Sequence, residues 1–182
     1  GHQSKRTETG RIRGGIGSFA DQVHPIYALS LYGEVYDKSE AVKTALDCAS
    51  QICRLQGPHG QWWWHYDSAS GRAIGRYPVY SVHQDGMAPM ALLAAGRAGG
   101  RDFGKEIDRG LDWIAGANEL GRDLIDRDRK LVWRSFYQNR FRKYLGEAAG
   151  VLKLERFIGP GRLKVLYECR PYHLGWVLYA FA

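Results

Sequence analysis

The chain has 182 residues, of which 45% are hydrophobic and 25% are charged. These proportions are typical of a globular protein and exclude a disordered chain, a collagen-like repeat and a dense disulfide scaffold. The length fits one domain. Its three cysteines, Cys48, Cys53 and Cys169, cannot all pair and lack zinc-type spacing, which favours a reducing, cytoplasmic compartment.

The net charge of +7 lies entirely in the last third of the chain. Residues 1–126 hold 14 basic and 15 acidic side chains, whereas residues 127–182 hold 12 basic and 4 acidic. This asymmetry favours an anionic partner, although a solvated basic face has the same pattern. The longest apolar run, residues 87–95, is less than half of the ~20 residues that a membrane span requires, and no apolar stretch resembles a signal peptide.

The first elements are an arm and a helix. Residues 1–23 are polar or glycine-rich and predict a loop or arm, followed by one domain over residues 24–182. A helix is predicted over residues 38–56, with Asp37 and Glu40 as a capping pair and Gly57 and Pro58 as its end. Its apolar stripe consists of Val42, Ala45, Leu46, Ala49, Ile52 and Cys53.

The other predicted helices cover residues 25–36, 82–96, 103–118, 133–154 and 171–181. Pro89 must either kink the helix predicted over residues 82–96 or mark its true first turn. Residues 60–80 form a long aromatic connection, and residues 163–167 a short extended piece. Because no series of alternating apolar residues appears, the predicted fold class is all-α, built from antiparallel helical hairpins.

Two segments resemble each other: each is a helix that ends in a polar turn leading to a tryptophan. The first places Gln56, Gly60 and Trp62 after its helix, and the second ends at Trp133. Repeated helix pairs predict stacked hairpins in which each unit buries its apolar face on the next.

The first unit resembles the QW-type repeat of the α/α-toroid proteins, which include squalene and terpenoid cyclases, protein prenyltransferase β subunits and, with the same architecture, six-hairpin glycosidases. The resemblance covers residues 24–133 and implies a partial α/α toroid around an aromatic cavity. The acid motif D-x-D-D of the cyclases is absent, the closest approach being Asp126-Arg127-Asp128. A full toroid has about twice as many helices as the six predicted, so the chain is either a C-terminal fragment of a longer protein or an incomplete ring.

Two polar clusters are candidates for acid–base chemistry. His83 and Asp85 lie where the aromatic connection enters a helix, and Glu168 and His173 lie just before the last helix. Paired carboxylates such as Asp85 and Glu168 suit glycoside cleavage. The alternatives are a helix cap for Asp85 and an ion pair between Glu168 and Arg170.

Aromatic side chains of the connection are candidates for substrate binding, because flat apolar rings with a polar edge suit sugars or isoprenoid chains. One or two of the three consecutive tryptophans are expected in a pocket wall and the others in the core. The candidate binding residues are Trp62, Trp63, Trp64, Tyr66, Tyr77 and Arg170, beside Tyr80.

A basic and aromatic stretch follows the second repeat unit. Arg134, Arg140, Arg142 and Lys143 suit an anionic membrane surface, or else form a solvated helix face. Nucleic acid is not expected, because no nucleic-acid-binding motif accompanies the stretch. No metal or cofactor is expected either, since phosphate-loop, dinucleotide and zincin motifs are absent and a zinc set of Asp85, Cys169 and His173 has the wrong spacing.

These patterns indicate a carbohydrate-active or carbohydrate-binding protein with an aromatic cleft and paired carboxylates, whose partner is an oligosaccharide or another small molecule. The alternatives are an isoprenoid-handling relative of the cyclases and a non-catalytic helical scaffold in polysaccharide assembly. Whether the chain is an enzyme, and whether it forms a homo-oligomer, stays open at this point.

Overall fold

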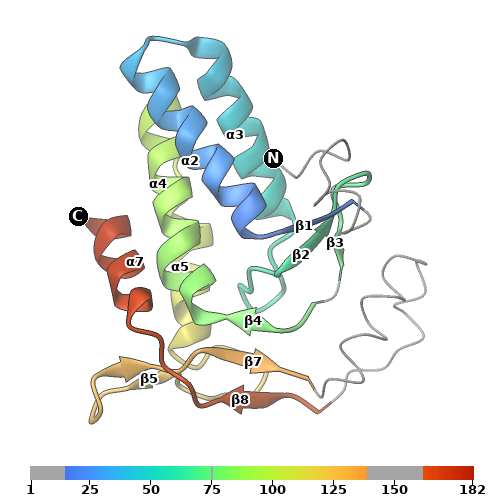
Figure 1. Cartoon of the computed structure of the whole chain (residues 1–182), viewed down its shortest axis with the longest axis vertical. Helices are drawn as coiled ribbons and strands as arrows, with labels where there is room; N and C mark the ends of the chain where they lie inside the picture. Colours follow the sequence, from blue (N-terminus) through green and yellow to red (C-terminus); the bar gives the residue numbers. More distant parts are fainter. Residues whose placement is uncertain (1–14, 75, 139–161) are drawn as a thin grey trace.

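A computed structural model describes residues 15–74, 76–138 and 162–182 (Figure 1). The all-α prediction is wrong: the described residues form five α-helices, a π-helical turn and three small antiparallel sheets. The helices pack together in one part of the molecule, and the strands lie beside and below them in the view of Figure 1. The partial all-helical toroid is therefore corrected to a mixed α and β fold.

Three helices form the main helical layer: α2 (Ala20–Val35), α3 (Ser39–Arg54) and α4 (Ala88–Gly99). Helix α2 packs against both others. Helix α3 buries one stripe that includes Ala45, Ala49 and Ile52, as the spacing predicted. Helix α4 is buried along most of its length, because small and apolar residues fill it.

Helix α2 begins before the predicted start at residue 25. Ser18 donates its hydroxyl to Asp21 Oδ2 at 2.8 Å, and the Ser18 N–H donates to the same oxygen at 2.7 Å. These bonds fix the first turn, so Pro25 lies inside the helix and the expected domain boundary at residue 24 falls within α2. At α3, Asp37 adopts a left-handed conformation with φ of 51° and no side chain caps the helix, so the predicted capping pair is wrong.

Two shorter helices complete the layer. Helix α5 (Gly104–Ile114) ends four residues before the predicted helix over 103–118, and α7 (Tyr172–Phe181) matches the predicted last helix. Helix α7 packs on α4 and on the π-helical turn η1 (His83–Met87). Each helix in the described ranges is too short or too polar to cross a lipid bilayer.

The strands are two or three residues long. β1, β2 and β3 form one antiparallel sheet, β4, β7 and β8 a second, and β5 and β6 a two-stranded ribbon. In the second sheet Tyr80, Ser135 and Leu166 stand opposite one another. The bounds are β1 (Ile16–Ser18), β2 (His65–Asp67), β3 (Ala73–Ile74), β4 (Val79–Tyr80), β5 (Ile125–Asp126), β6 (Leu131–Val132), β7 (Ser135–Tyr137) and β8 (Lys164–Leu166).

Strand β7 overturns part of the helix predicted over residues 133–154. Residues 135–137 pair with β4 and β8 instead of forming a helical turn, and residues 139–154 of that prediction lie outside the described residues. The extended piece predicted at 163–167 is confirmed by β8. Strands this short carry too few positions to display alternation, which explains why the sequence pattern missed the sheets.

The core joins the helices to the strands. Phe19, Trp62, Trp113, Leu124 and Phe136 are fully buried, and they come from segments spread along more than a hundred residues. The predicted aromatic connection therefore supplies core and strands rather than a loop over a cavity.

Candidate functional site

The first candidate cluster lies in the π-helical turn η1, directly after β4. The Ala88 N–H donates to the carbonyl of His83, five residues back, and Pro89 has no N–H to offer an α-helical bond. Pro89 therefore marks the first turn of α4, the second of its two predicted roles. Turns of this kind occur often at functional sites, and here His83, Gln84 and Asp85 all enter the interior.

Gln84 fixes the aromatic connection to η1. Its Oε1 accepts the Trp62 N–H at 3.0 Å, and its Nε2 donates to the Tyr80 carbonyl at 3.0 Å. Because Gln84 is fully buried, these two bonds hold β4 and the tryptophan segment at a set distance from the turn.

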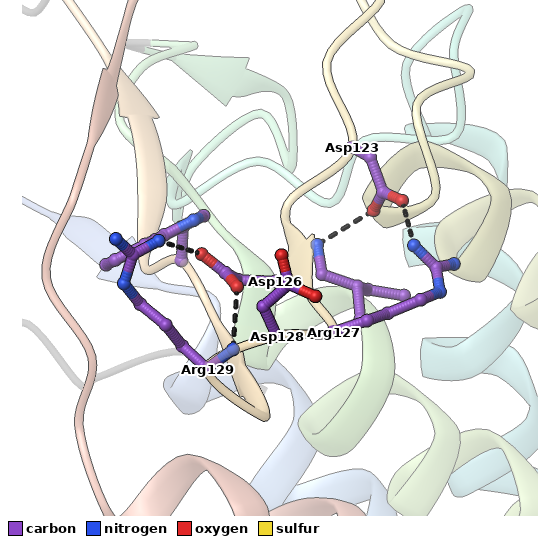
Figure 2. Close-up of a pocket in the computed structure, with 7 residues that line it drawn as sticks. Asp123, Asp126, Arg127, Asp128 and Arg129 are labelled. Carbon is purple, nitrogen blue, oxygen red and sulfur yellow. Dashed lines mark hydrogen bonds and ion pairs between the residues drawn. The ribbon is translucent and has the colours of Figure 1, made fainter.

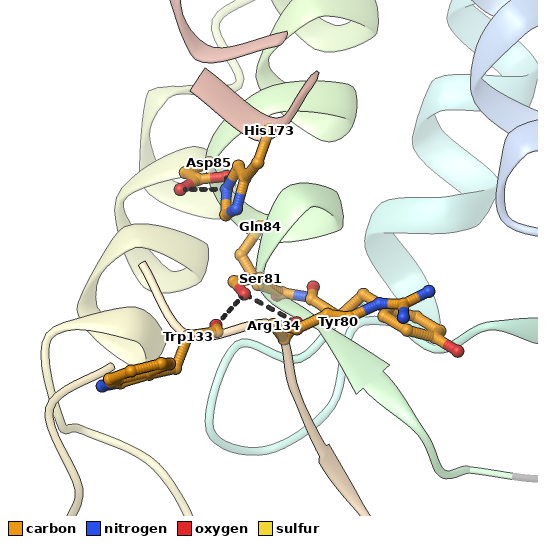
Figure 3. Close-up of polar contacts among 7 residues, drawn as sticks. All are labelled: Tyr80, Ser81, Gln84, Asp85, Trp133, Arg134 and His173. Atoms are coloured by element: carbon orange, nitrogen blue, oxygen red, sulfur yellow. Dashed lines mark hydrogen bonds and ion pairs between the residues drawn. The ribbon is translucent and has the colours of Figure 1, made fainter. Parts of the chain in front are cut away.

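Asp85 and His173 form a buried pair between η1 and α7 (Figure 3). His173 Nε2 lies 2.7 and 2.8 Å from the two carboxylate oxygens of Asp85. His173 is 5% exposed and Asp85 is 7% exposed. Burial raises the pKa of Asp85 above its ordinary value, and the hydrogen bond from His173 opposes this rise. The pair therefore joins residues 88 positions apart, and Asp85 does not serve as a helix cap.

His83 lies on another side of the same turn, among aromatic rings. Its ring centroid is 4.8 Å from that of Phe19 and 5.3 Å from that of Tyr80, and its Nδ1 is buried without a hydrogen-bond partner. Burial lowers the pKa of His83 to about 3, against a weaker opposing effect of the Trp62 backbone. The imidazole is therefore neutral at physiological pH.

Glu168 lies at the surface and is paired with two arginines. Arg134 Nη1 donates to Oε2 at 2.6 Å, and Arg170 donates to Oε1. The hydrogen bond from Arg134 holds the pKa of Glu168 below its ordinary value. The ion pair between Glu168 and Arg170, the alternative to a catalytic carboxylate, is thus present. Asp85 and Glu168 have separate partners and very different exposure.

A continuous series of contacts runs from Glu168 to the aromatic connection. The Arg134 guanidinium stands 5.3 Å from the Tyr80 ring centroid, and Trp64 meets Tyr80 edge to face at 4.7 Å. Trp64 also stacks on His65 at 4.8 Å. We call the series Trp64, Tyr80, Arg134, Glu168 and Arg170 the aromatic-arginine strip, and each of its side chains is at least partly exposed.

The other predicted binding residues lie elsewhere. Trp62, Trp63 and Tyr66 are buried in the core, so of the three consecutive tryptophans only Trp64 reaches the surface. Tyr77 donates its hydroxyl to Glu119, which also accepts bonds from Gln61 and Trp113. Trp62, Trp63 and Tyr77 therefore stabilise the fold and line neither of the two cavities described below.

Two of the cavities in the described part of the chain lie away from the predicted catalytic residues. One, of about 360 Å³, is lined by Asp123, Ile125, Asp126, Arg127, Asp128, Arg129 and Trp133, with Asp123 and Asp126 bonded to arginines (Figure 2). The other, of about 350 Å³, lies between α3 and the turn after β2, and Tyr66 is its one predicted residue. Neither cavity is lined by His83, Asp85, Glu168 or His173. The predicted shared hollow is therefore not found at these two places.

The remaining functional candidates are the predicted membrane surface and groups of metal-binding side chains. Arg140, Arg142 and Lys143 of the predicted membrane surface lie outside the described residues, whereas Arg134 belongs to the strip. In residues 15–74, 76–138 and 162–182, no group of three His, Cys, Asp or Glu side chains is placed to hold a metal ion.

Sequence reasoning did not connect Arg134 with Tyr80 and Glu168. The three residues come from β4, the segment before β7 and the segment after β8, which the second sheet brings together. No local spacing carries that information, because the pairing of these strands depends on tertiary structure.

Comparison of the chain with protein-family models, with curated proteins and with solved structures found no match. The resemblance to the toroid proteins thus stays a prediction, and the functional argument depends on the site itself.

Proposed function

We propose that this protein binds a carbohydrate at the aromatic-arginine strip. The observation that carries the proposal is the partly exposed Trp64 and Tyr80 beside a fixed arginine and carboxylate pair. Sugar rings bind to the apolar faces of aromatic side chains, and their hydroxyls bond to charged planar groups at the edge. The strip offers both chemistries side by side.

Binding is favoured over catalysis by the state of the two carboxylates. Both oxygens of Asp85 bond to His173 in the interior, and both oxygens of Glu168 bond to arginines. A glycosidase needs one carboxyl group to donate a proton and a second to face it across the substrate. Asp85 at 7% exposure does not offer that arrangement to a sugar.

The isoprenoid alternative has less support. A protein that encloses an isoprenoid chain needs a deep cavity lined by aromatic rings. Trp62, Trp63 and Tyr66 are packed in the core instead. Of the two cavities described above, one is bordered mainly by charged side chains, and the other by a mixture of polar and aliphatic residues with Tyr66 as its one aromatic ring.

The test is binding of the purified protein to a panel of neutral and acidic oligosaccharides, followed by calorimetry on those that bind. Trp64→Ala is expected to weaken binding about tenfold, equivalent to roughly 1.4 kcal/mol, because the stacking surface is lost. Trp64→Phe keeps a ring and is expected to lose less.

The matched control is Trp133→Ala. Trp133 is also partly exposed, but it meets Tyr167 edge to face at 5.1 Å and points away from Tyr80 and Arg134 (Figure 3). Its variant should keep full affinity. Equal affinity of Trp64→Ala and wild type, with unchanged melting temperature, or no binding to any member of the panel, would overturn the proposal.

A further inference from the structure

The strip has a net charge of one positive unit. Its two arginines, Arg134 and Arg170, share the single carboxylate of Glu168. Along the chain, the described residues outside the strip are also basic: residues 128–138 and 162–182 add Lys130, Arg162 and Lys164 against Asp128, whereas Arg129 is paired with Asp126. A ligand bound at the strip therefore meets a local excess of positive charge.

Both guanidinium groups are held in place and still have donors to offer. Arg134 uses Nη1 for Glu168 while its plane stands over Tyr80, and Arg170 uses Nη2 for the same carboxylate. The two side chains are 26% and 48% exposed. For Arg134, burial alone would lower the pKa, but the hydrogen bond and charge of Glu168 outweigh burial and raise it. Arg134 is thus a permanent, oriented cation.

We infer that the carbohydrate bound at the strip is anionic and carries a carboxylate, as in a uronate-containing oligosaccharide. This inference depends on the proposed function. A planar carboxylate accepts two parallel N–H bonds from a guanidinium, and its single charge matches the single excess cation. A neighbouring, uncharged sugar ring of the same oligosaccharide then stacks on Trp64, at the other end of the strip.

Polyphosphate ligands fit the strip less well. Nucleic acids and anionic bilayers are bound by several cations that neutralise successive phosphates. In the strip, by contrast, Glu168 neutralises one of the two arginines, so the strip offers one excess positive charge rather than a series of cations for successive phosphates. The geometry suits one monoanionic group beside an uncharged ring.

The experiment compares each oligosaccharide that binds in the panel with its carboxyl-reduced form, which keeps the linkage but loses the charge. Oligogalacturonate and hyaluronan oligosaccharides are included as probes. We expect uronate-containing members to bind best, and their reduced forms to bind about threefold to tenfold more weakly. The difference is modest because solvent screens the partly exposed charges.

Arg170→Gln should reproduce that loss for the acidic sugar and leave the reduced sugar unaffected. Arg170→Lys keeps the charge without the planar fork and should fall between the two. Arg127→Gln is the matched control, because Arg127 is 70% exposed and pairs with Asp123, outside the strip. It should bind like wild type.

The outcomes separate the two proposals. Binding that depends on Trp64 but is equal for acidic and reduced sugars would overturn the inference and keep the proposed function. If no sugar of the panel binds in a way that depends on Trp64, both the proposed function and the inference are overturned. Preference for anionic vesicles of phosphatidylserine or for single-stranded DNA over every uronate in the panel would also overturn the inference.

Discussion

His83 shows how one residue responds to its surroundings. Its imidazole packs between Phe19 and Tyr80, and burial lowers its pKa to about 3. In the unfolded chain the same group takes up a proton near its ordinary pKa of 6.5. Below pH 6.5 the unfolded state therefore binds more protons, and the protein loses stability as the pH falls toward 3.

The expected slope from His83 is at most about 1.4 kcal/mol of unfolding free energy per pH unit between pH 6.5 and 3. His83→Phe keeps an aromatic ring and should flatten the dependence in that window, measured by urea denaturation at several pH values. Asp85 contributes with the opposite sign, since its raised pKa gives stability that is lost as the pH rises through it. Parallel curves for wild type and variant would contradict the assignment.

At the scale of elements, α7 depends on a close approach to η1. A Cβ placed on Gly86 would lie 2.8 Å from Trp176 Cβ, so the glycine allows the two helices to touch. Further anchors are the buried Asp85 and His173 pair and a hydrogen bond at 2.5 Å between the Tyr27 and Tyr179 hydroxyls. His173 is the buried residue of α7, whereas its other residues are at least partly exposed.

Gly86→Ala is expected to displace α7, because the added methyl meets backbone-linked atoms that cannot give way. Hydrogen exchange of residues 172–181 should rise at least tenfold while exchange in α3 is retained. The matched control is Gly175→Ala, where a Cβ meets no atom within 4 Å and helix propensity improves. If both variants protect α7 equally, the close approach is not what holds it.

Helix α3 and strand β7 differ in how well the sequence pattern predicts them. The apolar stripe of α3 predicted that helix almost to the residue, because helical spacing is a local property. Strand β7 was predicted as helix, because Ser135, Phe136 and Tyr137 are too few to display alternation and pair with residues from two distant segments. Short strands are therefore decided by partners rather than by their own sequence.

At the scale of the whole molecule, Glu119 ties the end of α5 to the aromatic connection. Its Oε1 accepts the Gln61 amide at 2.7 Å and the Tyr77 hydroxyl, and its Oε2 accepts the Trp113 indole at 2.7 Å. One carboxylate thus satisfies three donors, two from the aromatic connection and one from α5. Such charge-assisted bonds are among the stronger polar contacts in a protein.

Glu119→Ala should lower the free energy of unfolding by about 2–4 kcal/mol, because three partly buried donors lose their acceptor. Denaturant unfolding followed by fluorescence and by circular dichroism should show one shifted transition. The control is Glu34→Ala, which removes the exposed pair with Arg97 and should cost less than about 1 kcal/mol. Similar losses in the two variants would contradict the role of Glu119.

The amino-acid sequence by itself determined the positions of α3 and α7, the candidate residues His83, Asp85, Glu168 and His173, and the excess of basic residues near the end of the chain. These features depend on composition and on contacts between near neighbours. Tertiary structure alone decided that Asp85 pairs with His173, that Trp62 and Trp63 are buried while Trp64 reaches the surface, and that Arg134 joins Tyr80 to Glu168. The reason is physical: burial and pairing across 30 to 90 residues depend on which surfaces pack together, and no local periodicity records that choice.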